Sequence, residues 1–434
     1  FLIKLIFFQL IEMSFFLFTP FIWNFEIKDI ENGTLRNVLF HSTPLEELDL
    51  SGLGIRHLEK NALDNVSTLK WLSLANNSLE SLPEFMFSNL SNLEYLSLAE
   101  NNLKNLEYLF VRLEKLRVLN ISCNPVLHLR RDDEELKNLE KMKDLSNNEI
   151  TEITKELLND LPEDLIYVNL RGNRIRCIWS QVIENRHLKI LNLSNNFLEK
   201  IEDGALAKTN LTSLTFFENQ LESLSFVSSL PSTLQVLVLA KNRFSSIPGG
   251  IFGLDSLQIL IITKNRLVEI ERDAFNGLKQ LTTLNFYQNS LTELQKGTFS
   301  GLENLKDLNL SSNKLQKITA DMFADLPQNL GYLHIDFNEI NSLEKGSFVN
   351  VPRFTLSLTG NKISTIPSGT FDLPTLRDLY LNNNTLTMID GDSYEGLPQL
   401  KHLLLIENQI NEIQKGSCKN LASLSILNIS RNPI

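Results

Sequence analysis

The sequence predicts an α/β solenoid of about 17 repeats that curves into a horseshoe, with a parallel β-sheet on its concave face. Two observations predict this fold. From residue 45 to residue 434 the pattern L-x-x-L-x-L-x-x-N-x-L recurs seventeen times, at steps of 23 to 25 residues. A second apolar position returns ten residues after the asparagine of many repeats. A short strand followed by a bulkier connector in every repeat bends such a stack.

The asparagine of the pattern is explained by backbone hydrogen bonding. Each strand buries its leucines, and the turn that follows leaves backbone groups in the interior without partners. An asparagine amide offers both donors and an acceptor, so stacked asparagines can bond to neighbouring turns. We therefore predict a structural ladder that begins after Leu53, which takes the place of asparagine in the first repeat. Its members are Asn77, Asn101, Asn124, Asn148, Asn173, Asn196, Asn219, Asn242, Asn265, Asn289, Asn313, Asn338, Asn361, Asn384, Asn408 and Asn432.

The second apolar position is mostly aromatic, which predicts a buried stack of rings behind the sheet. Tyr394 and Cys418 take the same place in two late repeats, so we expect Cys418 to be a buried thiol. The phenylalanines of this position are Phe87, Phe252, Phe275, Phe299, Phe323, Phe348 and Phe371.

These motifs resemble the leucine-rich repeat, in the 24-residue "typical" class found in Toll-like receptor ectodomains, chaoptin-like adhesion proteins and leucine-rich proteoglycans. Examples are LKWLSLANNSL at 69–79 and LKILNLSNNFL at 188–198. The resemblance covers about nine tenths of the chain. It implies the horseshoe fold and a recognition function, while the partners of the family differ widely.

The repeat pattern divides the chain into three parts. Residues 1–23 are almost wholly apolar and read as a possible signal peptide, with Lys4 at its charged end. Alternatives are untranslated sequence upstream of Met13, or a membrane span, against which Glu12 and Pro20 argue. Residues 24–44 form an N-terminal flanking segment, and 45–434 the repeat array. Because the array stops inside its seventeenth repeat without a cap, we expect it to be truncated at the C-terminus.

Two stretches depart from the repeat. In LEKMKDLSNNEI (139–150) the leucines fall out of phase with Asn148, which predicts a bulge or slipped register in repeat five. Just before it, LRRDDEELKNLEK (129–141) replaces the usual apolar connector with charge. That segment is either a docking surface or a short solvated helix with paired charges.

Composition and motifs argue against several functions. A formal net charge of −11 and a pI near 5.2 disfavour nucleic acid and anionic membranes as partners. The three cysteines are too few and too scattered for a disulfide framework. The histidines show no metal-ligand spacing, and no phosphate-binding or nucleophile-elbow motif occurs. Carboxylates such as Asp307, Asp336 and Asp378 read as scattered surface charges, so we expect no enzyme, no cofactor and no small-molecule substrate.

Ten N-x-S/T sequons occur, little more than chance gives for this composition. Several of these sequons arise from the strand-to-turn residues of the repeat motif itself. Asn65 and Asn89 lie in connectors and are the better candidates for carrying a glycan.

The concave face carries the strongest prediction of a binding site. Alternate strand residues point away from the leucines, and they are polar in most repeats. In repeats eight to eleven they are apolar, which predicts one contiguous exposed patch formed by Phe217, Val236, Val238, Ile259, Ile261 and Tyr287. An aromatic surface continues along later repeats with Tyr332, His334, Phe337, Tyr380, His402 and Leu404. We expect this face to bind a partner; the alternative is that a neighbouring loop or a second copy of the chain covers the patch.

Two functions follow from this pattern. The favoured one is an extracellular or cell-surface recognition module, secreted or part of a receptor or adhesion protein, that binds a protein ligand, a co-receptor or a glycan. The alternative is an intracellular scaffold that holds a partner protein on the same face. Unpaired cysteines favour the second; the apolar leader, the repeat class and the sequons favour the first.

Overall fold

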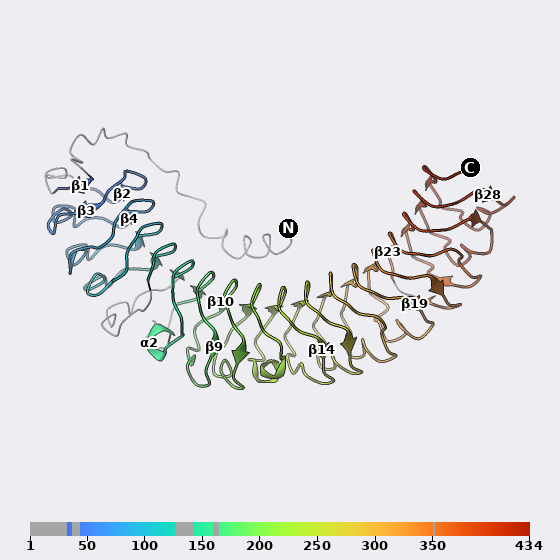
Figure 1. The fold of residues 1–434 in the computed structure, drawn as a ribbon, viewed down its shortest axis with the longest axis horizontal. Helices are drawn as coiled ribbons and strands as arrows, with labels where there is room; N and C mark the ends of the chain where they lie inside the picture. The colour runs from blue at the N-terminus through green and yellow to red at the C-terminus, as the bar shows by residue number, and fades with distance from the viewer. Residues whose placement is uncertain (1–32, 37–43, 127–141, 159–164, 350–351) are drawn as a thin grey trace.

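The computed structural model describes residues 33–36, 44–126, 142–158, 165–349 and 352–434. They form an open horseshoe in which the chain completes one coil per repeat (Figure 1). The longer strands lie side by side along the inner side of the arc, and the first and last coils lie at its two tips (Figure 1). The predicted solenoid is confirmed.

The concave face is one parallel sheet, which contains seventeen three-residue strands in the described ranges. Each strand pairs in register with the strand of the next repeat, and β2 and β29 have a strand on one side only among the described residues. The strands are β2 (Glu47–Asp49), β4 (Trp71–Ser73), β5 (Tyr95–Ser97), β6 (Val118–Asn120), β7 (Met142–Asp144), β8 (Tyr167–Asn169), β10 (Ile190–Asn192), β12 (Ser213–Thr215), β13 (Val236–Val238), β15 (Ile259–Ile261), β17 (Thr283–Asn285), β18 (Asp307–Asn309), β20 (Tyr332–His334), β23 (Thr355–Ser357), β25 (Asp378–Tyr380), β27 (His402–Leu404) and β29 (Ile426–Asn428).

The outer side of the horseshoe consists of turns and two-residue strands rather than helices. In the part of the chain that the structure describes, the helical elements are α2 (Lys155–Leu158) and the 3₁₀ turn η2 (Ser225–Ser229). A repeat of this length leaves few residues for its connector, and short helices gain little stability on their own. The short strands are β1 (Thr34–Leu35), β3 (His57–Leu58), β9 (Cys177–Ile178), β11 (Lys200–Ile201), β14 (Ser246–Ile247), β16 (Glu269–Ile270), β19 (Lys317–Ile318), β21 (Ser342–Leu343), β22 (Phe348–Val349), β24 (Phe371–Asp372), β26 (Met388–Ile389) and β28 (Glu412–Ile413).

A continuous core runs between the sheet and the connectors, and the predicted aromatic stack lies in it. The rings of Phe252 and Phe275 stack with centroids 5.8 Å apart, and those of Phe275 and Phe299 with centroids 6.4 Å apart. The stack continues through the next three repeats to Phe371. The prediction for Cys418 is wrong, because its side chain is exposed. It lies in the last described connector, between β27 and β29, so a neighbouring connector covers it on one side only.

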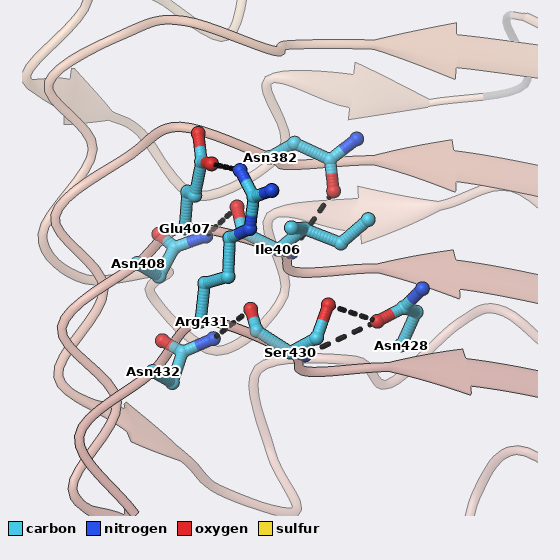
Figure 2. A network of polar contacts seen from close by, with 8 residues as sticks. All are labelled: Asn382, Ile406, Glu407, Asn408, Asn428, Ser430, Arg431 and Asn432. Carbon is cyan, nitrogen blue, oxygen red and sulfur yellow. Dashed lines mark hydrogen bonds and ion pairs between the residues drawn. The ribbon is translucent and has the colours of Figure 1, made fainter.

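The predicted asparagine ladder is also confirmed. The Asn265 amide nitrogen donates to the carbonyl oxygens of Leu239 and Ile262, at 3.0 and 3.3 Å. Its oxygen accepts from the backbone N–H of Asn242 at 3.1 Å. Figure 2 shows two further rungs, Asn408 and Asn432, with the same donation to backbone carbonyl groups. The ladder thus supplies hydrogen-bond partners to backbone groups of the turns. These groups form no strand or helix hydrogen bonds.

From residue 142 onward, repeat five shows neither a bulge nor a slipped register, so the prediction is wrong for the described residues; residues 139–141 lie outside them. Residues of β7 pair one to one with those of β6 and β8, and Lys143 lies between Leu119 and Val168. The ladder residue Asn148 holds the usual bonds to Ile121 and Leu145, which keeps the register. Lys143 consequently takes a leucine position and is 3% exposed.

Several predictions fall on residues outside the described ranges. They are the possible signal peptide at 1–23, most of the flanking segment 24–44, and the charged segment 129–141. In the described ranges, no helix has the length and apolar character needed to cross a bilayer.

Candidate functional site on the concave face

The concave face carries a second apolar cluster that is separate from the leucine core. Its buried members are Val238, Ala240 and Ile261. They come from β13, β15 and the turn after β13, and the half-exposed residues Phe217, Val236 and Ile259 pack against them. We call these six residues the concave apolar cluster. The sequence predicted five of them; Ala240 was missed because alanine in a turn carries little hydrophobic signal.

The exposure expected for this patch is wrong at two positions. Val238 and Ile261 are only 3% and 6% exposed. They are paired residues of adjacent strands, so each side chain covers the other. Phe217, Val236 and Ile259 remain half-exposed and form the solvent-facing part of the cluster.

Tyr287 is half-exposed but does not belong to the concave apolar cluster. It lies in the row of turn residues that includes Ala240, with Thr263 between the two. At the other side of the cluster, the Lys241 ammonium lies 4.9 Å from the ring centroid of Phe217 and 3.2 Å from Glu218. The cluster is therefore bordered by polar and charged groups, as in protein interfaces.

The later repeats present aromatic residues on the same face. Tyr332 and Phe337 are 46% and 59% exposed, whereas His334, Tyr380 and His402 are half-buried. The strands from β18 to β27 pair in register, so these residues lie on neighbouring strands or the turns that follow them. The structure therefore brings them onto one surface, beyond the concave apolar cluster along the arc.

Carboxylates accompany the histidines of this surface. His402 Nδ1 lies 2.6 Å from Asp378 Oδ1, and the Thr355 hydroxyl donates to the other oxygen at 3.3 Å. Asp378 also lies near Tyr380, whose pKa is raised, first by burial and then by that negative charge. One carboxylate thus holds an imidazole and a hydroxyl across three strands.

Asp307 faces the same surface from β18. Burial raises the pKa of its carboxyl, and the positive charge of nearby His334 opposes the shift. Asp336, in the turn after β20, accepts hydrogen bonds from the Ser357 hydroxyl and the Thr359 N–H. Hydrogen bonds to the fold thus hold the carboxylates of Asp336 and Asp378 in place. In the described part of the chain, no three histidine, cysteine or acidic groups are placed to hold a metal ion.

Sequence reasoning missed an aromatic residue at the edge of this surface. Phe354 precedes β23, and its ring centroid lies 5.9 Å from that of Tyr332. The guanidinium carbons of Arg353 and Arg377 lie 5.8 and 5.4 Å from the Phe354 ring centroid. A signal was available, because Arg353 stands where the repeat pattern calls for leucine.

The glycan candidates lie away from the concave face. Asn65 and Asn89 are exposed residues of the connectors in the first and second repeats of the pattern. The Asn89 amide donates to Asp64 Oδ1 at 2.9 Å. Both side chains are open to solvent, as an acceptor site requires.

The leucine rich repeat profile matches residues 43–103, 67–126, 232–291, 280–328, 328–384 and 374–434, more than half of the chain. The chain belongs to the leucine-rich repeat family. A profile for the BspA type leucine rich repeat region matches the intervening residues 134–230.

Curated leucine-rich repeat relatives are similar over short stretches. Leucine-rich repeats and immunoglobulin-like domains protein 3 of Mus musculus is 42% identical over 77 residues, which are 17% of this chain and 7% of the relative. Epiphycan of Homo sapiens is 30% identical over 132 residues, 25% of this chain and 41% of the relative. The chain therefore matches less than half the length of either protein.

Solved structures share the leucine-rich repeat fold over most of the chain. Toll in the Drosophila Toll–Spatzle complex has a TM-score of 0.76 and 22% identity, over 90% of this chain and 55% of that chain. A leucine-rich repeat protein of Leptospira interrogans has a TM-score of 0.60 and 26% identity, over 88% of this chain and 95% of that chain. The plant hormone receptor RGFR1, in complex with RGF2, has a TM-score of 0.60 and 22% identity, over 90% and 65%. These likenesses show that the chain shares the leucine-rich repeat fold.

Proposed function

We propose that this chain is an extracellular recognition module that binds a protein partner on the concave face of repeats eight to sixteen. The concave apolar cluster forms the centre of the interface, and the surface from Tyr332 to His402 extends it. The observation that carries the proposal is the cluster itself. A horseshoe needs one core, and a second cluster on the concave face adds apolar surface that water covers in the free protein.

The composition of the surface supports a protein partner. Half-exposed Phe217, Val236 and Ile259 offer apolar area, and exposed Tyr332 and Phe337 offer aromatic anchors. Charged residues border both groups, which matches an apolar centre with a polar rim. Toll with Spatzle and RGFR1 with RGF2 are complexes built on the same fold.

The test substitutes the half-exposed members of the cluster. Val236→Asp with Ile259→Asp places two charges on the surface and leaves the mutually buried pair Val238 and Ile261 intact. The wild-type chain and this variant would be screened against an array of secreted and cell-surface proteins, with thermal unfolding measured in parallel. We expect the variant to fold and to lose the partner that wild type binds. Retention of that partner by the folded variant contradicts the proposed interface.

A matched control tests whether added charge weakens binding only on the concave face or anywhere on the surface. Ser246 and Glu269 lie on the outer strands β14 and β16 of the same two repeats and are exposed. The Ser246→Asp variant adds charge there and is expected to bind normally. If it loses the partner as well, the effect does not belong to the concave face.

The extracellular location is part of the proposal, and the alternative is an intracellular scaffold. Expression of the full gene in secreting cells, followed by glycosidase treatment, separates the two. We expect secreted product that loses mass on deglycosylation, with the change reduced in Asn65→Gln and Asn89→Gln variants. Product retained in the cytosol without glycan favours the scaffold. Binding of RNA or DNA by the wild-type chain, measured separately, would contradict the expectation drawn from net charge.

A further inference from the structure

Beside the concave face, one row of residues changes its charge along the arc. Each member directly precedes a concave strand, and the backbone links successive members by hydrogen bonds. In repeats twelve to sixteen the row reads Lys306, Gly331, Phe354, Arg377 and Lys401. Arg353 stands next to it. We call Lys306, Arg353, Phe354, Arg377 and Lys401 the cationic edge.

In the same row near the other tip of the horseshoe, the positive charges are paired with carboxylates. There Lys70 pairs with Glu46 at 3.0 Å, and Arg117 pairs with Glu94 at 3.9 Å. In the cationic edge, the four cations form no ion pair with a carboxylate among the described residues. This difference is notable in a chain whose formal net charge is −11.

The arginines of the cationic edge are arranged around an aromatic ring. Both guanidinium groups lie within 5.8 Å of the Phe354 ring centroid, a distance at which cations and aromatic faces attract. A Cβ at residue 331 would lie 3.1 Å from the Phe354 ring, so glycine makes room for it. A guanidinium held in this way keeps its N–H groups available for a planar carboxylate.

The repeat pattern adds an independent reason to assign a function here. The neighbouring repeats bury Leu330 and Leu376 at the position of Arg353, whereas Arg353 is exposed. Replacing a core leucine by an exposed arginine gives up hydrophobic stabilisation of the fold. The exposed cation at this position therefore contributes nothing to the leucine core.

We propose that the cationic edge binds an acidic peptide segment of the protein partner. Its carboxylates accept hydrogen bonds from Arg353 and Arg377. This rests on the proposed function, since it names the chemistry of the partner beside the same face. A protein segment fits better than a long polyanion. Asp307 and Asp378 directly follow Lys306 and Arg377, so a polymer with charge on every unit meets repulsion along the face. A segment with a few carboxylates touches the cations alone.

The experiment measures fluorescence anisotropy of a short labelled peptide that alternates glutamate and serine, against the same peptide with glutamine. We expect the full chain to prefer the glutamate peptide, with affinity that falls as salt rises. Arg353→Gln with Arg377→Gln should weaken binding about tenfold or more, on the scale of a lost charge-assisted contact. The Lys189→Gln variant, in the same row but outside the cationic edge, should bind as wild type does.

Three results would overturn the inference. They are equal binding of both peptides, unchanged binding by the double arginine variant, and tighter arginine-dependent binding of a heparin oligosaccharide of matched charge. Arg353→Lys with Arg377→Lys, which keeps the charge, is expected to bind more weakly than wild type and more tightly than the glutamine variant. Thermal unfolding reports whether each variant folds. The Val236→Asp and Ile259→Asp variant should still bind the peptide. Peptide binding by the cationic edge is therefore tested separately from partner binding by the concave apolar cluster.

Discussion

The ring of Phe337 lies directly over Gly360 of the next repeat. A Cβ at residue 360 would come within 2.5 Å of the ring, and Phe337 itself has a φ of 53°. A bulky residue in the left-handed region is strained. Two coils thus hold an exposed aromatic ring within the proposed interface.

Gly360→Ala should therefore displace this ring and destabilise the fold. The backbone at residue 360 has a φ of 71°, so alanine is strained there even without a clash. Gly204→Ala is the matched control, with a φ of 77° and nothing within 4 Å of the new Cβ. We expect a loss of about 1 kcal/mol at residue 204, and a clearly larger loss at 360. Equal changes in chemical unfolding would contradict the role of the ring contact.

Asn265→Ala should test the asparagine ladder. It leaves the N–H of Asn242 and the carbonyl of Leu239 without their side-chain partner. We expect a loss of about 1 to 3 kcal/mol in the free energy of unfolding. Gln409→Ala, beside ladder residue Asn408, changes an exposed side chain and should cost little. If urea titrations give the same loss for both variants, asparagine has no special structural role.

Val238 and Ile261 should show energetic coupling. Each is buried against the other on the concave face, outside the leucine core. Single alanine substitutions should each cost about 1 to 3 kcal/mol, less than for the largest core truncations. The double variant should cost less than the sum of the two, by about 0.5 kcal/mol or more. Strict additivity in equilibrium unfolding would indicate that the pair does not share a cluster.

Asp307 should make stability depend on pH. Burial raises the pKa of its carboxyl in the folded chain, so the folded state holds the proton more strongly than the unfolded state. Its stabilising protonation is complete below the ordinary value of 3.8 and is lost as pH rises through the folded pKa. Asp307→Asn should therefore stabilise the chain at neutral pH more than in acid. The unfolding midpoint of wild type and variant, measured at both pH values, checks this; a pH-independent difference would contradict it.

The repeated pattern by itself determined the architecture of this protein. Leucine, asparagine and phenylalanine return at a fixed interval, and each has one physical task in a coil, so their positions predict the sheet, the ladder and the aromatic stack. The pattern also placed Val236 and Ile259 on the inner face, because strand residues alternate between two faces. Each of these features depends on motif residues that recur at the same position in every repeat.

Contacts between coils were decided by tertiary structure. Register places Val238 against Ile261 and buries both, which alternation alone cannot show. Cys418 follows the apolar pattern yet is exposed, because burial of that position requires a coil on each side. The Phe354 ring meets arginines from two successive repeats only when the coils stack. A one-dimensional pattern states which face a side chain takes, whereas its exposure and partners depend on what the adjacent coil brings within reach.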